Sequence, residues 1–263
     1  MHVHRGLRVA AALGATLLAA FVVVACGSDD TASTADGGEV VVSAATSLKG
    51  AFTSYGARFT DAEAQFSFAG SDELAAQIRA GARPDVFASA NTKLPDALFE
   101  EGLVERPQVF ASNRLVIAVP AAGTKVRSLS DVGNVGVTLV IGAEGVPIGA
   151  YTRTVLGRLD GATRARVLAN VRSNEPDVGG ISAKLTQGAA DAGVLYVTDV
   201  VATNGRLKAI ELPRALQPQV TYGVAVVKRA PHRKAALTFV AGLLDGTGSA
   251  ALRAAGFTPA FAP

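Results

Sequence analysis

Four segments that could present hydrogen-bond donors stand directly before stretches with helical periodicity. They are residues 43–48, 68–74, 145–151 and 175–181, and all are rich in small residues or Pro. The first two follow runs typical of buried strands, and each places a serine, Ser47 or Ser71, where a helix is expected to begin. A helix N-terminus carries backbone N–H groups with no partner inside the helix, and these favour an anion.

The later part of the chain adds donors of the same kind. Pro147 is favoured in the first turn of a helix and leaves the following N–H groups free, and Tyr196 ends a predicted strand over residues 193–195. Singly, such a serine is usually an N-cap worth about 1 kcal/mol, and such a tyrosine usually belongs to the core. Ligands of open α/β sheets bind beyond the carboxyl ends of the strands. The shared position of these donors therefore favours a binding site over ordinary helix capping.

The reactive residues of the chain exclude several kinds of site. Of 263 residues, one is a cysteine, Cys26, and His232 is the only histidine after residue 25. A Cys–His nucleophile, a structural zinc cluster and an internal disulfide are therefore excluded. His232 stands in a basic stretch, residues 228–234, and is expected to be a solvated surface side chain. The formal charge of +3 and the absence of a basic run interleaved with aromatic residues do not indicate nucleic acid as a partner.

Residues 1–25 have the layout of a secretory leader. Basic residues precede an apolar run over residues 9–24, which is shorter than the roughly 20 residues of a membrane-spanning helix. The run ends at Ala25-Cys26, a layout that resembles a bacterial lipoprotein signal with residues 23–26 as the lipobox. A plain secretory leader is the alternative. We expect a signal peptide over 1–25, a lipid on Cys26, and a flexible tether over 27–38 that holds the folded part on the extracytoplasmic face of the cell membrane.

From Glu39 onward, short β-branched runs alternate with amphipathic segments, which predicts an α/β fold. Two long apolar runs, residues 114–119 and 222–227, bracket a second α/β stretch of about a hundred residues. We expect lobe 1 to comprise residues 39–117 and 223–263 and lobe 2 to comprise residues 118–222, with two hinge strands between them. Such an arrangement suits hinge closure around a ligand.

Over residues 39–263 the chain resembles the molybdate-binding proteins (ModA type) of ABC transporters, two-lobed α/β proteins of the periplasmic-binding-protein type II fold. The matching segments are 43–48, 68–78, 81–90, 146–151, 175–178 and 193–199. The resemblance implies that the oxyanion is bound by the hydroxyls of Ser47, Ser71 and Tyr196 and by the backbone N–H groups of Ile148 and Val178. It also implies a monomer without cofactor or catalytic activity, which binds molybdate and tungstate and delivers them to a permease with a cytoplasmic ATPase.

Two carboxylates stand beside the expected site, and one of them, Asp72, departs from the pattern of that family. Asp72 is expected to turn to solvent while favouring the helix N-terminus, and Asp177 to act as an N-cap. If either faced the ligand, it could accept the hydrogen of a phosphate ion. Sulfate and phosphate therefore remain alternative ligands. A surface hydrolase that uses a serine with His232, and a structural lipoprotein without a small ligand, are the readings from other classes.

Overall fold

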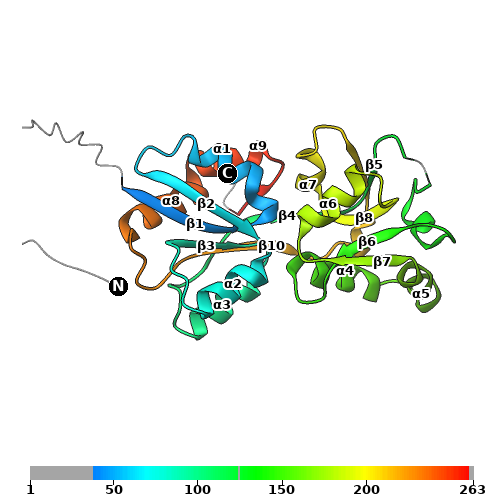
Figure 1. Cartoon of the computed structure of the whole chain (residues 1–263), viewed down its shortest axis with the longest axis horizontal. Coiled ribbons are helices and arrows are strands. Elements are labelled where there is room, and N and C mark those ends of the chain that lie inside the picture. Colours follow the sequence, from blue (N-terminus) through cyan, green and yellow to red (C-terminus); the bar gives the residue numbers. More distant parts are fainter. Residues whose placement is uncertain (1–37, 124, 261–263) are drawn as a thin grey trace, which may run out of the picture. The chain divides into compact units, whose positions relative to one another are not determined.

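The β-branched runs of the sequence form the centres of two sheets in the computed structural model of the chain, which describes residues 38–123 and 125–260. Each sheet is flanked by helices and makes one lobe (Figure 1). The expected signal peptide, the lipid-bearing Cys26 and nearly all of the tether lie outside the described residues.

In lobe 1 the strands follow the order β11-β4-β10-β3-β1-β2. Their bounds are β1 Glu39–Ala45, β2 Glu63–Ala69, β3 Val86–Ser89, β4 Gln108–Asn113, β10 Val220–Val226 and β11 Thr258–Pro259. β1 is parallel to both β2 and β3, and its register pairs Ala45 with Ala69 and Ala44 with Ala88. The carboxyl ends of these three strands therefore lie at one edge of the sheet.

In lobe 2 the strands follow the order β7-β6-β8-β5-β9. Their bounds are β5 Leu115–Pro120, β6 Leu139–Gly142, β7 Val171–Glu175, β8 Ala192–Tyr196 and β9 Leu207–Glu211. β6 is parallel to β7 and β8, so these carboxyl ends also share an edge.

Several helices begin at Pro, Gly or a capping Asp: one begins with Pro147, one follows Gly70, and two follow the N-cap residues Asp160 and Asp177. Lobe 1 carries η1 Thr46–Leu48, α1 Lys49–Gly56, α2 Ser71–Arg79, α3 Lys93–Glu100, α8 Arg233–Asp245 and α9 Thr247–Ala254. Lobe 2 carries η2 Leu129–Gly133, α4 Pro147–Gly157, α5 Gly161–Ala169, α6 Val178–Thr186 and α7 Val197–Val201, with η3 Arg214–Leu216 on the return segment. Within the described ranges, no single helix is long and apolar enough to span a membrane, and only the bent pair α8–α9 reaches that length and composition jointly.

The chain changes from one sheet to the other at two places. It leaves lobe 1 at Arg114, between β4 and β5, and returns between Glu211 and Val220. The predicted lobe boundaries, after residues 117 and 222, fall inside β5 and β10 instead. The apolar run 114–119 is predicted to be a hinge strand, but it forms β5 and pairs with β8 and β9 inside lobe 2. A central strand that is buried on both faces also has a continuous apolar sequence, so the pattern does not distinguish it from a hinge strand.

His232 lies at the other edge of the lobe 1 sheet, where β1 begins. Asp85 is fully buried and accepts hydrogen bonds from the backbone N–H groups of Val41 (2.8 Å) and His232 (2.7 Å). The His232 Nδ1 atom lies 3.0 Å from the same carboxylate. The prediction of a solvated histidine is therefore wrong: His232 is the N-cap residue of α8, and a buried carboxylate that needs donors holds its ring.

Gly149, in the first turn of α4, lies against the end of β6. A Cβ atom at this position would stand 1.7 Å from the carbonyl oxygen of Ala143. At the other end of the same helix, nothing lies within 4 Å of a Cβ built on Gly157. Close packing at Gly149 therefore fixes where α4 begins, whereas Gly157 is unconstrained.

We expect Gly149→Ala to destabilise the protein by about 2–3 kcal/mol, because the α4 N-terminus must move away from β6. Gly157→Ala in the same helix is the matched control, and it should be neutral or stabilise by up to about 1 kcal/mol. Chemical denaturation measures both. Equal effects of the two substitutions would contradict the close packing at Gly149.

Candidate functional site

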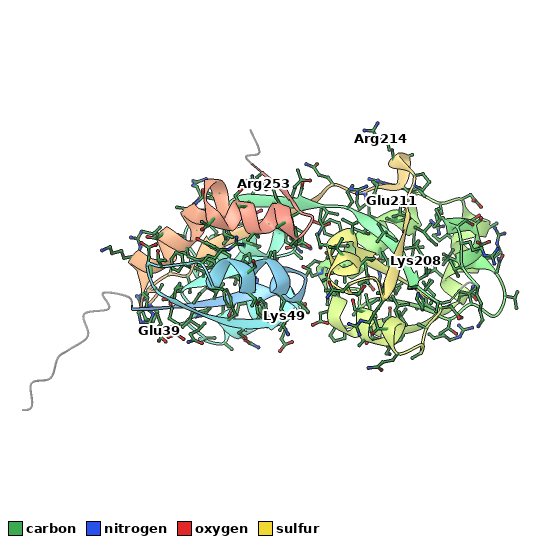
Figure 2. All side chains as sticks on the ribbon, turned by 90° about the horizontal axis from the view of Figure 1, so that it is seen from above. Glu39, Lys49, Lys208, Glu211, Arg214 and Arg253 are labelled. Atoms are coloured by element: carbon green, nitrogen blue, oxygen red, sulfur yellow. The ribbon has the colours of Figure 1, made fainter. Side chains whose placement is uncertain are left out.

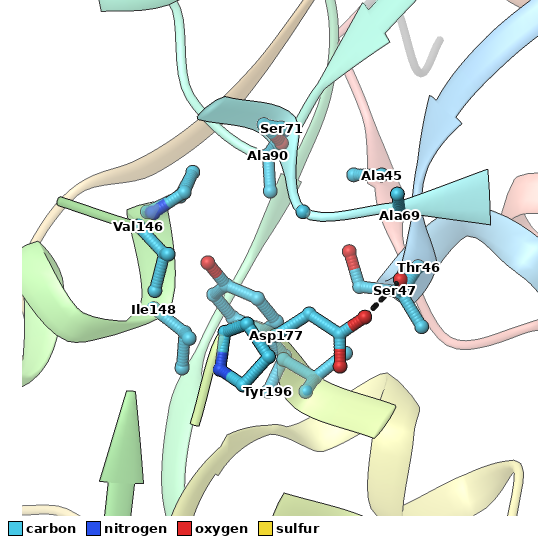
Figure 3. A pocket seen from close by; sticks show the side chains of 14 residues that line it. Ala45, Thr46, Ser47, Ala69, Ser71, Ala90, Val146, Ile148, Asp177 and Tyr196 are labelled. Carbon is cyan, nitrogen blue, oxygen red and sulfur yellow. Dashed lines mark hydrogen bonds between the residues drawn. The ribbon is translucent and has the colours of Figure 1, made fainter. Parts of the chain in front are cut away.

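A small cavity lies where the carboxyl edges of the two sheets face each other. Its empty space, part of which is open to solvent, is about 240 Å3. Four helical segments, η1, α2, α4 and α6, begin at its wall (Figure 3). The residues lining it are Ala45, Thr46, Ser47, Ala69, Gly70, Ser71, Ala90, Val146, Pro147, Ile148, Pro176, Asp177, Val178 and Tyr196. The structure thus brings together all five residues that were predicted to bind the oxyanion.

Lobe 1 contributes two serine hydroxyls. Ser47 belongs to η1, directly after β1, and its Oγ lies 3.1 Å from the hydroxyl oxygen of Tyr222 in β10. Ser71 begins α2 one residue after Gly70, and its Oγ accepts a hydrogen bond of 3.1 Å from the Ala90 N–H. Because its oxygen already accepts from the backbone, the Ser71 hydroxyl can use its hydrogen as a donor toward the cavity.

Lobe 2 contributes backbone N–H groups at two helix N-termini. α4 begins with Pro147, which has no N–H, so Ile148 carries the first free N–H of that helix. α6 begins with Val178, directly after its N-cap residue Asp177. Neither N–H has a partner within its own helix at these positions, and the positive ends of both helix dipoles are directed at the cavity.

Tyr196, at the end of β8, supplies a hydroxyl with an unused hydrogen. The residue is 1 % exposed, and within the described part of the chain no group is in hydrogen-bond geometry with its hydroxyl. Burial raises the pKa of Tyr196 well above its ordinary value, so the hydroxyl keeps its hydrogen. The Tyr222 hydroxyl is near enough to contribute to the raised pKa of Tyr196 without meeting that geometry. Buried hydroxyls are normally satisfied, so this hydroxyl is available to an acceptor bound in the cavity.

Within the described part of the chain, one charged side chain lines the cavity, and it is already engaged in hydrogen bonds. Among the described residues that line it, Asp177 is the only ionisable carboxylate, and no Lys or Arg occurs. Its Oδ1 accepts from the Gly180 N–H at 3.0 Å, which confirms the predicted N-cap, and its Oδ2 accepts from the Thr46 hydroxyl at 2.7 Å. The second bond joins the two lobes (Figure 3).

The basic residues near the motifs lie outside the cavity lining. Lys49 and Arg83 are exposed, and Figure 2 shows Lys49 on the side of lobe 1 nearer to lobe 2. Arg153 donates to the carbonyl oxygens of Gly142 and Gly149, both at 3.1 Å. Among the described residues, no group of three or more His, Cys, Asp or Glu could hold a metal ion. The cavity thus offers neutral donors rather than a cation.

Asp72 is partly buried and does not turn fully to solvent as predicted. Its Oδ1 is buried and has no partner among the described residues. A Cβ atom on Gly70 would stand 2.9 Å from this oxygen and also 2.9 Å from the carbonyl oxygen of Pro176. The Asp72 Oδ1 atom and the Pro176 carbonyl oxygen of lobe 2 therefore both lie close to Gly70.

Three residues of the site region were not predicted. Thr46 precedes Ser47 directly and joins the lobes, while Tyr222 and Asn113 lie behind Ser47. In the sequence, Tyr222 differs from its neighbours only as the one hydroxyl-bearing residue of the apolar run 222–227. Its contact with Ser47 joins residues 175 positions apart, and no local pattern indicates that pairing.

Asp199 lies behind Tyr196, and its Oδ2 accepts from the Tyr196 N–H at 3.1 Å. Burial raises the pKa of Asp199 to about 7, and the negative charge of Asp177 acts in the same direction. The hydrogen bond from Tyr196 opposes this shift without cancelling it. Because the folded-state pKa exceeds the ordinary value of 3.8, the folded protein holds this proton more tightly than the unfolded chain.

We therefore expect the stability contributed by Asp199 to be complete below about pH 4 and to be lost as pH rises toward 7. Asp199→Asn keeps an acceptor for the Tyr196 N–H but cannot ionise. The melting temperature of this variant minus that of the wild type should grow by at least a few degrees from pH 4 to pH 7, since about 1 kcal/mol shifts a domain of this size by about 2–4 °C. A difference that stays constant with pH in thermal unfolding would contradict the raised pKa.

Comparison with known proteins places this geometry in a family. Residues 40–258 match the family described as bacterial extracellular solute-binding protein. The molybdate-binding protein ModA of Mycobacterium tuberculosis (strain H37Rv) is 37 % identical over 247 residues, which cover 89 % of this chain and 92 % of that protein.

Solved structures share the fold. The periplasmic molybdate-binding protein of Azotobacter vinelandii superposes with a TM-score of 0.75 at 20 % identity, covering 85 % of this chain and 99 % of the other. The sulfate-binding protein SubI of Mycobacterium tuberculosis H37Rv gives 0.74 at 16 % identity, covering 85 % and 87 %. The predicted two-lobed periplasmic-binding-protein type II architecture is confirmed, and the chain belongs to the family of bacterial extracellular solute-binding proteins.

Proposed function

We propose that this chain captures molybdate in the cavity between its lobes and delivers it to an ABC importer. The observation that carries the proposal is the buried Tyr196 hydroxyl without a partner, which faces a cavity walled by four helix starts. The relative that is 37 % identical and bears the name molybdate-binding protein supports the choice of ion.

The chemistry of the cavity suits a fully deprotonated tetrahedral dianion. Such an ion has only acceptors, so its ideal site offers only donors. The hydroxyls of Ser47, Ser71 and Tyr196 and the N–H groups of Ile148 and Val178 would supply five, and helix N-termini stabilise the negative charge without a cationic side chain. Tungstate has nearly the same size and the same charge, so we propose that it binds as well.

Two other ions belong to the same class of ligand. Sulfate differs from molybdate mainly in size, and a sulfate-binding protein has nearly the same fold similarity to this chain. Phosphate keeps a hydrogen at neutral pH and needs an acceptor. The buried, unpartnered Oδ1 of Asp72 is the atom that favours this alternative, although Asp72 does not line the cavity.

The geometry does not favour a serine hydrolase. His232 contacts Asp85 at the edge of the sheet where β1 begins, whereas Ser47 follows its other end. Seven residues of extended strand separate the two by about 20 Å, which is too far for proton transfer between them.

Delivery requires partners outside this chain. We propose that the loaded protein, a monomer without cofactor, docks on a permease whose cytoplasmic ATPase drives uptake. Donors from both lobes meet at the ion, so the ion stabilises the form in which the lobes are together. The Thr46–Asp177 hydrogen bond supports that form in the same way.

Binding can be tested by calorimetry and thermal shift of residues 38–263 with molybdate, tungstate, sulfate and phosphate. We expect stabilisation by molybdate and tungstate, of about 2.7 kcal/mol at an ion concentration 100 times the dissociation constant. Ser47→Ala should weaken molybdate binding about tenfold or more, since a hydrogen bond to a charged group contributes about 1.5–3 kcal/mol. Ser54→Ala, an exposed serine in α1, is the matched control and should leave binding unchanged.

Tyr196→Phe separates a binding role from a structural one. Because the hydroxyl is buried without a partner, its removal should leave the stability of the unliganded protein unchanged or higher while weakening molybdate binding. Stabilisation by phosphate, lost in Asp72→Asn, would instead assign the phosphate alternative. No shift with any of the four ions would overturn oxyanion capture.

We further propose that a lipid on Cys26 anchors the protein to the outer face of the cytoplasmic membrane. Two acyl chains suffice for stable anchoring, whereas a signal peptide alone leaves the cleaved protein free. In bacteria that export the chain, Cys26→Ser should move it from the membrane fraction to the medium or periplasm. Retention of the Cys26→Ser protein in membranes would contradict the lipid anchor.

A further inference from the structure

The hydroxyls of Ser47 and Tyr222 contact each other next to the anion site. Their hydroxyl oxygens lie 3.1 Å apart, and either could donate. Ser47 has a single hydrogen. If Ser47 donated it to Tyr222, it would present only lone pairs to the cavity and would repel an anion. If Tyr222 donates, the Ser47 hydrogen is free for the ion.

The orientation of Asn113 decides between the two. Its Oδ1 accepts from the backbone N–H of Arg114 at 2.9 Å, and a flipped amide would set two donors against each other there. Its Nδ2 therefore faces the other way. It donates to the Thr198 hydroxyl at 2.8 Å and, by a longer hydrogen bond of 3.4 Å, to the Tyr222 hydroxyl oxygen.

Donation from Tyr222 to Ser47 is the direction that satisfies every group in this contact. The Tyr222 oxygen accepts from Asn113, so its hydrogen needs a different acceptor. Among the described residues, Ser47 is the other group in hydrogen-bond geometry with the Tyr222 hydroxyl. The Tyr196 hydroxyl also interacts with Tyr222 but lies outside that geometry. The side chain is fully buried, and burial raises the pKa of Tyr222 well above its ordinary value, with the negative charge of Asp199 acting in the same direction. The hydroxyl therefore keeps the hydrogen it has to donate.

We propose that Asn113 and Tyr222 are positioning residues that hold the Ser47 hydroxyl as a donor to the bound anion. The direction of donation runs from the Asn113 amide to Tyr222, from Tyr222 to Ser47, and from Ser47 to the ion. This inference rests on the proposed function of the cavity. The Ser71 Oγ accepts from the Ala90 N–H, so its hydrogen is available to the ion as well.

The relay also lies at the junction of the lobes. Asn113 is the last residue of β4, next to the point where the chain leaves lobe 1, and Tyr222 belongs to β10, on which the chain returns. Thr198, the other acceptor of the Asn113 amide, belongs to α7 of lobe 2. The donor state of Ser47 is therefore set by residues that connect the lobes and not by its own helix.

A double-mutant cycle tests whether Tyr222 acts through Ser47. We expect Tyr222→Phe to weaken molybdate binding roughly fivefold in the wild-type background, within the range of one lost hydrogen bond. In the Ser47→Ala background the same substitution should cause no further weakening. Calorimetry gives the four dissociation constants. Tyr55→Phe is the matched control: Tyr55 is also buried in lobe 1 and donates to the Phe239 carbonyl at 3.0 Å, away from the cavity, so its loss should leave the dissociation constant unchanged.

Asn113→Asp provides an independent second variant. A carboxylate cannot donate, so Tyr222 must turn its hydrogen toward it, and Ser47 must then donate to Tyr222. Binding should weaken more than in Tyr222→Phe, and part of that loss should vanish in the Ser47→Ala background, leaving only the repulsion by the added charge.

The outcomes separate this inference from the proposed function. Absence of molybdate binding by the wild type would overturn both. If the wild type binds and Ser47→Ala weakens binding, an unchanged dissociation constant in Tyr222→Phe would overturn the relay alone. Equal weakening by Tyr222→Phe with and without Ser47 would also overturn it, because a purely structural role is additive.

Discussion

Buried hydrogen-bond donors without protein acceptors are the constraint around which this structure is organised. The N-termini of four helical segments lie at one cavity, and the Tyr196 hydroxyl lies beside them without a partner among the described residues. Leaving such groups buried and unpaired costs free energy, and an anion with several lone pairs removes that cost for all of them at once. A cationic side chain is not needed there, because the backbone dipoles already provide the positive potential.

The rest of the fold supplies the precision that this arrangement needs. Parallel pairing of β1 with β2 and β3, and of β6 with β7 and β8, brings every contributing helix start to the two facing edges. The contact of Gly149 with Ala143 fixes the start of α4 against β6, and the Asp177 carboxylate fixes the start of α6. Because backbone N–H groups cannot rotate toward a ligand as side chains do, their positions must be set by packing of whole elements.

The direction in which a hydroxyl donates its hydrogen matters as much as the position of the hydroxyl at the cavity. A serine hydroxyl can donate or accept, so its place at the cavity does not determine what it offers. At Ser71 the Ala90 N–H occupies one lone pair of the oxygen and leaves the hydrogen available, and at Ser47 the fixed amide of Asn113 sets the direction through Tyr222. Asp72 is the exception to a site built from donors, since its buried Oδ1 is an acceptor held near the Pro176 carbonyl at the lobe boundary.

Local sequence was sufficient for most of the fold and for the site residues that belong to helix starts. Strand runs, the Pro147 turn and the serines at Ser47 and Ser71 carry local signals, because capping and turn formation depend on neighbours within a few residues. The lobe crossings, the contact of His232 with Asp85 and the direction of Asp72 were missed or misjudged. So was the Asn113–Tyr222–Ser47 chain, which joins residues 109 and 175 positions apart. Those features depend on which surfaces meet when two sheets form and face each other, and that is a property of the folded chain that no short window of residues contains.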